Sequence, residues 1–166
     1  MRLRQFVPEE FCLRCQGCCR YKESASVWVP CLLDEEVQCL LDKDIPPAAI
    51  SSDRRLLAVP GENCQGYFCP FLNTRDNKCK IYAFRPFECQ LYPFLINLRA
   101  RKVILTADLN CPYIKENLKS KEFKEYAEYL SNFLNSPRQI KILKENPQII
   151  QAYEEVLDVV ELQIPE

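Results

Sequence analysis

The sequence predicts an α+β fold, in which short strands and irregular, cysteine-rich loops are followed by C-terminal helices. The chain has 166 residues and 11 cysteines, and no cysteine follows Cys111. In the cysteine-rich part, short apolar runs end at proline or glycine, which is typical of strands joined by turns. After Pro112 the apolar residues recur at helical spacing. We therefore expect a cysteine-rich domain at residues 1–113 and a helical support packed on it at residues 114–166.

The first sixty residues are expected to hold two short strands and one helix. Residues 26–32 contain a β-branched V-W-V run and predict a strand. A helix is predicted from Asp34 to Leu41, because Asp34 can cap it and its apolar residues share one face. A second strand is predicted from Arg54 to Val59, before the turn signal of Pro60-Gly61.

The rest of the chain predicts brief extended pieces, a hairpin and two helices. Extended segments are expected at residues 67–68 and 80–82. Residues 94–98 and 102–107 are expected to pair as a hairpin around Arg99-Ala-Arg. A helix at residues 147–157 and a strand at 159–164 are expected near the end. Another helix is predicted by apolar residues at helical spacing, which are Phe123, Tyr126, Ala127, Leu130, Phe133 and Leu134.

Composition and charge narrow the classes of partner. Hydrophobic residues make up 48% of the chain and charged residues 27%, as in an ordinary globular protein. The formal net charge is -1, so no broad basic surface indicates nucleic acid or an anionic membrane as partner. No apolar stretch approaches the roughly 20 residues that cross a bilayer, and the first ten residues lack the apolar segment of a secretory signal. We therefore expect a cytoplasmic protein that binds neither nucleic acid nor membrane.

The run C-L-R-C-Q-G-C-C carries Cys12, Cys15, Cys18 and Cys19 in a chain that has no histidine. Thiols stay reduced in the cytoplasm, and an odd total of 11 cysteines suits disulfides poorly, so the pattern favours metal binding. A helical run would place Cys18 off the face of the other three thiols, and an extended one would point Cys18 and Cys19 to opposite sides. Two neighbouring centres, or one cluster and an additional thiol, explain the doublet best.

The later cysteines stand in the frames C-P-F-L, C-K-I-Y, R-P-F-E-C-Q-L-Y-P-F and a last C-P. Together with C-x2-C-x2-C-C, this order resembles the YkgJ-type cysteine-cluster family, which is described as zinc- or iron-chelating. Its cysteine domain is also similar to that of flagellin lysine N-methylases. The resemblance covers roughly residues 10–113 and implies eight metal ligands, which are Cys12, Cys15, Cys18, Cys19, Cys69, Cys79, Cys89 and Cys111.

Three cysteines remain outside this set. Cys31 and Cys39 are expected to be small buried hydrophobes, because free cysteine is among the most buried residue types. Cys64 lies five residues before Cys69, so it is either an ordinary loop residue or a substitute for a family ligand.

Arg85 is the candidate cofactor-binding residue, because a cation four residues before Cys89 can offset the negative charge of a thiolate site. Arg14 and Arg20 flank the first cysteine group in the same way. The alternative for Arg85 is a structural role, either as the cap of a short helix or as the partner of Glu88.

The cysteines leave the metal open between iron and zinc. Structural zinc takes four ligands, so eight thiolates suffice for two sites, but iron–sulfur clusters also take four cysteines each. The compact C-x2-C-x2-C run, closed by a distant C-P, is similar to ferredoxin ligation, and we favour an iron–sulfur cluster of the 4Fe–4S type. Zinc is the alternative cofactor.

Three functions follow from different classes. The first is a metalloprotein that carries out redox or metal-dependent chemistry, with metal ions and a protein as its partners. The second is a structural zinc domain that serves as an interaction module. The third, implied by the resemblance, is a component of a lysine-methylating enzyme, although the chain has no glycine-rich fingerprint for a nucleotide cofactor. Whether the chain is an enzyme is left open by the sequence.

Overall fold

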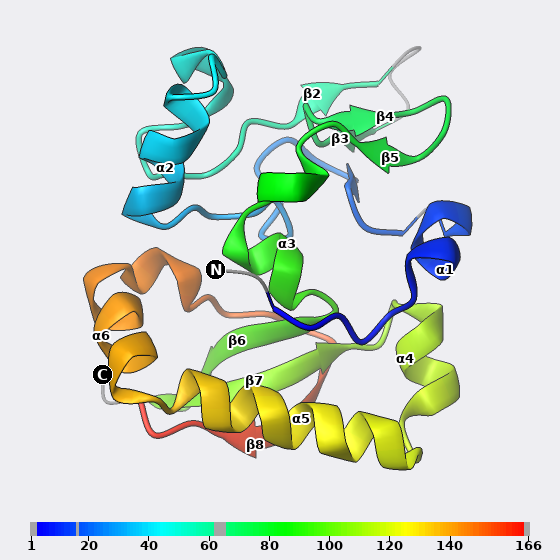
Figure 1. Cartoon of the computed structure of the whole chain (residues 1–166), viewed down its shortest axis with the longest axis vertical. Coiled ribbons are helices and arrows are strands. Elements are labelled where there is room, and N and C mark those ends of the chain that lie inside the picture. The colour runs from blue at the N-terminus through cyan, green and yellow to red at the C-terminus, as the bar shows by residue number, and fades with distance from the viewer. Residues whose placement is uncertain (1–2, 16, 62–65, 165–166) are drawn as a thin grey trace. The chain divides into compact units, whose positions relative to one another are not determined.

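The computed structural model describes residues 3–15, 17–61 and 66–164. It confirms the predicted α+β class, with antiparallel strands and C-terminal helices (Figure 1). The chain divides into two compact units, which we name the cysteine unit (Pro8–Gln90) and the sheet unit (Met1–Val7 with Leu91–Glu166). The two units join along the chain at residues 90/91, and the hairpin that begins at Phe94 pairs with the C-terminal strand.

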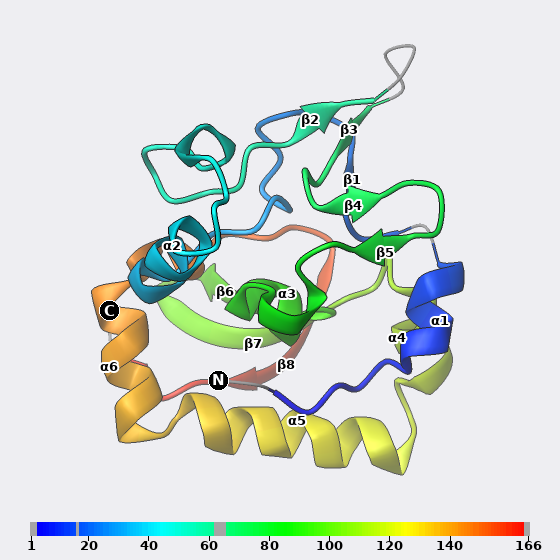
Figure 2. The same cartoon turned by 45° about the horizontal axis from the view of Figure 1, so that its top comes forward.

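The cysteine unit is built from short elements. Its α-helices are α1 (Glu9–Arg14), α2 (Asp34–Leu41) and α3 (Phe87–Leu91), and its 3-10 turns are η1 (Pro47–Ala49) and η3 (Tyr82–Phe84). Strands β1 (Arg20–Tyr21), β3 (Tyr67–Phe68) and β2 (Val59–Pro60) form one antiparallel sheet in that order, and β4 (Leu72–Asn73) pairs with β5 (Lys78–Cys79). The two small sheets lie side by side in both views (Figures 1 and 2).

The core of the cysteine unit contains cysteine as well as aliphatic and aromatic side chains. Leu40 of α2 and Leu56 are almost completely buried in it together with Cys69. Cys19 and Cys79 pack against the same core from its partly buried rim. These three candidate ligands are therefore part of the hydrophobic interior or of its rim, and their surroundings are set by ordinary packing.

The helix predicted at residues 34–41 is confirmed as α2. Its cap is Leu33 and not Asp34, and the carboxylate of Glu36 accepts a hydrogen bond from the Leu33 amide at 3.0 Å. The extended piece at residues 67–68 is confirmed as β3, whereas residues 80–82 form a turn that leads into η3.

The strand predicted at residues 26–32 is wrong, because this segment forms a turn with an isolated bridge at Cys31. The Arg55 guanidinium binds the carbonyl oxygens of this segment: Nη1 donates to the Val29 carbonyl oxygen at 2.6 Å and to the Val27 carbonyl oxygen at 3.2 Å. These bonds stabilise the turn, and they take the place of the pairing with a neighbouring strand that the oxygens would have in a sheet. The second predicted strand, residues 54–59, is reduced to isolated bridges at Arg55 and Leu56, with β2 beginning only at Val59.

The sheet unit has one three-stranded antiparallel sheet with helices beside it. Its strands are β6 (Phe94–Arg99), β7 (Lys102–Asp108) and β8 (Val156–Glu161), in the order β6-β7-β8. Its helices are α4 (Pro112–Asn117), α5 (Lys121–Leu134), α6 (Pro137–Glu145) and the 3-10 turn η4 (Pro147–Ile149). Helix α5 runs along the sheet (Figure 1), and Phe94 of β6 stacks on Phe123 of α5 with ring centroids 5.4 Å apart.

The predicted hairpin is confirmed as β6 and β7. Ala100 and Arg101 form its two-residue turn with φ of 49° and 64°, the left-handed pair that matches the twist of hairpin strands. The predicted helix of apolar residues 123–134 is confirmed as α5, which begins at the Ser120 cap.

The helix predicted at residues 147–157 is wrong. The second C-terminal helix is α6, where Ser136 accepts a hydrogen bond from the Gln139 amide and Pro137 occupies the first turn. Pro147 opens only the 3-10 turn η4. The strand predicted at residues 159–164 is found as β8, which begins earlier, at Val156, and ends at Glu161. Among the described residues, no helix is both long enough and apolar enough to span a membrane.

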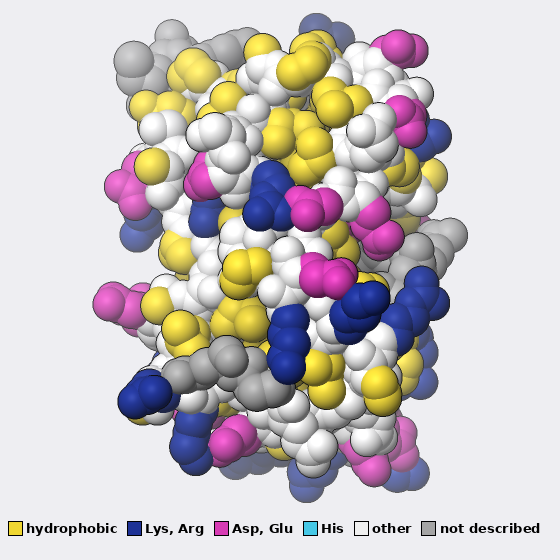
Figure 3. Space-filling model, turned by 90° about the vertical axis from the view of Figure 1, so that its left-hand side faces the viewer, with side chains coloured by type: hydrophobic (Ala, Val, Ile, Leu, Met, Phe, Trp, Pro, Cys, Tyr) yellow, Lys and Arg dark blue, Asp and Glu magenta, His cyan; other side chains and the backbone are white. Residues whose placement is uncertain are grey.

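The surface carries charges of both signs. In Figure 3, basic, acidic and hydrophobic side chains are interspersed over the face shown, with no field of a single sign. This agrees with the formal net charge of -1.

Candidate metal centre

The eight predicted ligands lie on short elements, and seven of them belong to the cysteine unit. Cys12 lies in α1 and Cys15 at its C-terminal end, while Cys18 and Cys19 form the turn before β1. The others are Cys69 after β3, Cys79 in β5, Cys89 in α3 and, in the sheet unit, Cys111 at the start of α4. No disulfide joins any of the ten cysteines that the structure describes.

Three of these thiols form a continuous hydrogen-bonded chain. The Cys18 side chain is hydrogen-bonded to that of Cys19, and Cys19 is in turn hydrogen-bonded to Cys69. The contact with Cys19 raises the pKa of the Cys18 thiol well above its ordinary value. For Cys19, the bond with Cys18 lowers the pKa, but the bond with Cys69 and burial outweigh it and raise the pKa to about 12. Cys18 and Cys19 therefore hold their protons at neutral pH.

Cys79 and Cys89 belong to the same group of thiols. Burial raises the pKa of Cys89, and the neighbouring Cys19 and Cys79 add to the effect. Burial also raises the pKa of Cys79, to which Cys18 adds a smaller contribution. We name these five residues, Cys18, Cys19, Cys69, Cys79 and Cys89, the thiol cluster.

Arg85 is the cation that acts on the thiol cluster. Its guanidinium acts to lower the pKa of Cys18, Cys79 and Cys89. The net pKa of each thiol is still raised, because burial and the neighbouring thiols together have the larger effect. The guanidinium lies 4.5 Å from the centre of the Tyr82 ring, which fixes its position. The sequence also offers Glu88 as the partner of Arg85. In the structure the Glu88 carboxylate accepts a hydrogen bond from the Cys31 backbone amide at 2.7 Å, which competes with that pairing.

The cysteine doublet has a distinctive backbone. Cys19 has a φ of 69°, in the left-handed region that residues other than glycine rarely adopt. The doublet is therefore a turn, and neither of the two geometries considered from the sequence applies to it. A residue with a β-carbon in the left-handed region costs about 1 kcal/mol. At Cys19 this cost accompanies a turn that directs the side chains of Cys18 and Cys19 into one cluster.

Tyr21 is a residue of this region that the sequence analysis did not select. It is 8% exposed, and its pKa is raised first by burial and then by four thiols of the cluster, Cys69, Cys19, Cys89 and Cys18. The available signal was strand alternation: residues 19 and 21 lie two positions apart beside β1, so their side chains can face the same side.

The other cysteines divide as follows. Cys31 is buried as predicted, with 1% of its surface exposed. The prediction for Cys39 is wrong, because it is exposed on α2, on a different face from the buried Leu40. Cys64 lies outside the described residues.

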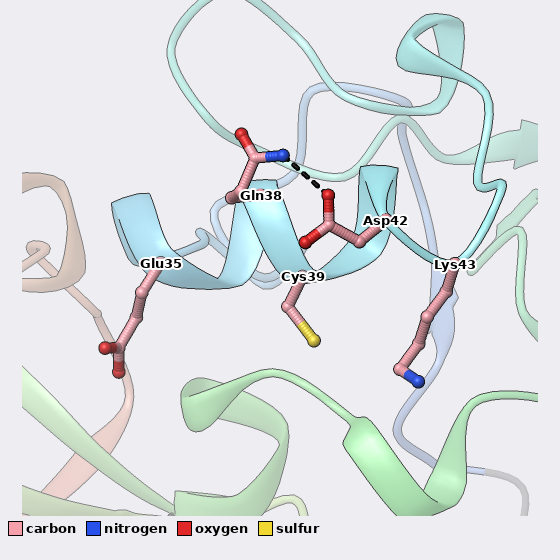
Figure 4. Close-up of a pocket in the computed structure, with 5 residues that line it drawn as sticks. All are labelled: Glu35, Gln38, Cys39, Asp42 and Lys43. Carbon is pink, nitrogen blue, oxygen red and sulfur yellow. Dashed lines mark hydrogen bonds between the residues drawn. The ribbon is translucent and has the colours of Figure 1, made fainter.

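A shallow pocket of about 510 Å³ lies on α2, away from any of the eight predicted ligands. Figure 4 shows that its side chains come from α2 and from the turn that follows the helix, and the Gln38 amide donates to Asp42 at 2.7 Å. Its lining residues are Glu35, Gln38, Cys39, Asp42 and Lys43. The pocket is therefore a feature of the outer helix surface and not of the thiol cluster.

The arginines of the first cysteine group contact protein groups. Arg14 donates from Nε to the Glu10 carbonyl oxygen at 3.2 Å within α1, and Arg20 donates from Nη2 to Oδ1 of Asn77 at 2.6 Å.

In the sheet unit, Asp108 accepts hydrogen bonds from the Tyr92 hydroxyl and the Asn110 backbone amide, both at 2.8 Å, in the turn that leads to Cys111.

The chemistry of the thiol cluster fits a thiophilic metal. Within the described residues, no three Cys, Asp or Glu side chains are arranged so that they could hold one metal ion. The donors are nonetheless sulfur atoms joined by hydrogen bonds, and soft thiolates select zinc, copper(I) and iron–sulfur clusters. A metal that binds here replaces the protons of these thiols.

Comparison with known proteins agrees with this arrangement. Residues 11–112 match CxxCxxCC, described as "Putative zinc- or iron-chelating domain". The chain belongs to the CxxCxxCC family. Membership supports metal-ion binding and names zinc and iron alike.

One relative is the uncharacterized protein MJ0661 of Methanocaldococcus jannaschii, 35% identical over 72 residues. The match covers 40% of this chain and 40% of the relative, so the two share a segment and not their full lengths. No solved structure matches the chain.

Proposed function

We propose that the cysteine unit binds metal through cysteine thiolates, as an iron–sulfur cluster of the 4Fe–4S type with a second metal site beside it. The observation that carries the proposal is the hydrogen-bonded chain of Cys18, Cys19 and Cys69, with Cys79 and Cys89 beside it. Membership of the CxxCxxCC family supports the binding of zinc or iron. The preference for a cluster rests on the C-x2-C-x2-C run and the distant C-P.

The thiol cluster supplies five of the proposed ligands, and α1 supplies Cys12 and Cys15. Cys111 remains a ligand on the resemblance alone. Each thiol must lose its proton to become a ligand, so binding releases protons and is opposed by the burial of the sulfur atoms. Arg85 offsets the negative charge that these thiolates bring, because it already acts on Cys18, Cys79 and Cys89.

When bound, the cluster would supply one-electron redox chemistry. The residues of this chain then hold the cluster, limit the access of water and set the surrounding charge. Tyr21 contributes to the second of these roles, since its side chain is buried in the same core as Cys69. We further propose a cytoplasmic location, metal ions as partners and a protein as electron partner. A part in lysine methylation rests only on the resemblance to flagellin lysine N-methylases.

The test is metal and sulfide analysis of the full chain purified without oxygen. We expect iron and acid-labile sulfide in equal amounts, with a broad visible absorbance that bleaches under dithionite. Zinc without sulfide contradicts the cluster and supports the structural zinc module. A chain with neither metal, even after reconstitution with iron and sulfide or with zinc, contradicts metal binding as a whole.

The matched variants are Cys89→Ser and Cys39→Ser. Cys89 belongs to the thiol cluster, whereas Cys39 is an exposed cysteine of α2. We expect Cys89→Ser to lose metal and Cys39→Ser to retain the full content. Equal content in the two variants contradicts the ligand assignment of Cys89.

A further inference from the structure

Two hydrogen bonds join the N-terminal cysteine group to the hairpin that carries Cys79, and neither involves a thiol. The Asn77 side chain donates from Nδ2 to the Leu13 carbonyl oxygen at 3.1 Å. Its Oδ1 atom accepts from Nη2 of Arg20 at 2.6 Å. One side chain of the β4–β5 turn thus bonds to α1 and to the beginning of β1.

Each half of this contact has a physical reason. Leu13 lies in the last turn of α1, where carbonyl oxygens have no amide partner within the helix. Asn77 supplies that partner from the neighbouring hairpin. It also has a φ of 57°, which asparagine tolerates better than most residues. The amide side chain offers a donor for Leu13 and an acceptor for Arg20 on two separate atoms.

Arg20 is itself held on the other side. Its guanidinium lies 5.7 Å from the centre of the Phe68 ring, and Phe68 is its partner across the β1–β3 ladder. Phe68 is followed directly by Cys69, and Arg20 is preceded directly by Cys19. Arg20 and Asn77 therefore connect three segments of the chain. The first carries Cys12 and Cys15, the second carries Cys19, and the third runs from Cys69 to Cys79.

We propose that Arg20 and Asn77 form a metal-independent clip, which holds α1 beside the Cys79 hairpin before any metal binds. The clip rests on the proposed function, because its role is to bring Cys12 and Cys15 toward the remaining ligands. Leu13 lies between these two cysteines, so the bond from Asn77 fixes the part of α1 that carries both. Arg20 and Asn77 are positioning residues: they touch the segments and not the metal.

Two substitutions of Asn77 separate the clip from the turn that it occupies. Asn77→Asp keeps the acceptor for Arg20 and loses the donor for Leu13, whereas Asn77→Gly keeps the left-handed backbone and loses both bonds. The control is Arg75→Ala. Arg75 is an exposed residue of the same hairpin, and its substitution removes the same charge as Arg20→Ala. All variants are made in the full chain.

The first readout needs no metal. In the metal-free protein, hydrogen exchange of the Cys12 and Cys15 amides reports the opening of α1, since they bond to Pro8 and Phe11. Losing one net hydrogen bond predicts about fivefold faster exchange in Asn77→Asp and Arg20→Ala, and Asn77→Gly, which loses both bonds, is expected to exchange faster still. We also expect Cys12 and Cys15 to react faster with an alkylating reagent, and Arg75→Ala to match the wild type in both measurements.

The second readout is the affinity for Zn²⁺, measured by competition with a chelator, since thiolate sets accept zinc as well as iron. We expect about fivefold weaker binding in the clip variants and unchanged binding in Arg75→Ala. If the wild type binds Zn²⁺ but the clip variants match Arg75→Ala in exchange and affinity, the clip is wrong and the proposed function stands. If the wild type binds no Zn²⁺ and forms no cluster on reconstitution, the proposed function is wrong and the clip loses its role with it.

Discussion

The backbone amide of Cys69 donates a hydrogen bond to the carbonyl oxygen of Cys19 at 3.0 Å. The two cysteine groups of the sequence are thus joined through the main chain, in addition to the bond between the two thiols. Main-chain pairing does not depend on metal or on redox state. It keeps the doublet next to the second group even when the thiols are protonated.

Single replacement of the doublet tests how the ligands divide. Cys18→Ser and Cys19→Ser are each expected to lower the bound metal to about half. Each substitution removes one ligand from one four-thiolate centre and leaves the other centre intact. Metal per chain is measured by elemental analysis. Cys39→Ser, on the surface of α2, is the control and keeps the full content. Wild-type content in both doublet variants contradicts a division between two centres.

Loss of the Arg85 charge is expected to weaken metal binding by about 10- to 100-fold, the usual effect of a partner that tunes the ligands. The reason is that Arg85 lowers the pKa of three thiols and so favours their thiolates. Competition with a chelator compares Arg85→Gln with Arg75→Gln, which removes an exposed arginine nearby in the chain. Arg85→Lys keeps the charge and is expected to lose less. Equal affinities of the two glutamine variants contradict the electrostatic role.

Glu36 predicts a pH dependence of stability. Burial raises its pKa to about 7, although hydrogen bonds from the Leu33 and Phe87 amides lower it. The folded state then binds a proton that the unfolded state has released, so the contribution is complete below pH 4.5 and is lost as the pH rises through about 7. Glu36→Gln is expected to flatten this decline in thermal denaturation of the metal-free protein.

Glu35→Gln is the control for this measurement, since Glu35 is an exposed neighbour on α2. It is expected to retain the wild-type slope between pH 4.5 and 7. A wild-type slope in Glu36→Gln as well would assign the pH dependence to other groups.

Removal of the metal is expected to affect the two units differently. The cysteine unit has short elements, and the binding free energy of its metal adds to its folding free energy. The sheet unit has its own core, in which Phe94 and Leu130 have no exposed surface. After treatment with a chelator, hydrogen exchange is therefore expected to rise across residues 8–90 and to change little in β6, β7 and α5. A uniform rise along the chain contradicts this prediction.

The elements that the sequence predicts well are those with local causes. Helix α5 follows from apolar residues at helical spacing, and the β6–β7 hairpin follows from two apolar runs around a short polar turn. Helix α6 has a local cause as well, because Ser136 and Pro137 form a helix-start signal. Pro147, which the prediction uses instead, starts only a 3-10 turn.

The errors in the cysteine unit have distant causes. Residues 26–32 have the composition of a strand, but Arg55, far along the chain, gathers their carbonyl oxygens into a turn. Cys39 was assigned to the interior from residue type alone, which carries no information about the face of α2 on which it lies. Propensity cannot anticipate contacts that only the folded chain makes.

The candidate site shows the same limit. The motif order identifies the cysteines, but not which of them contact one another. Tyr21 enters the site only because β1 pairs with β3 and places it near Cys69, and Asn77 enters only because its turn reaches α1. Both relationships are tertiary.

The sheet unit is interrupted in sequence, because the chain leaves it after Val7 and returns at Leu91. Phe6 and Phe94, on either side of the interruption, have ring centroids only 5.9 Å apart. The cysteine unit is therefore a closed excursion from a host fold, like a domain inserted at a surface loop. On a ribosome, every thiol of that excursion is synthesised before β6, the first strand of the host. Cys111 is the one proposed ligand that the nascent chain gains only with the strands of the host fold.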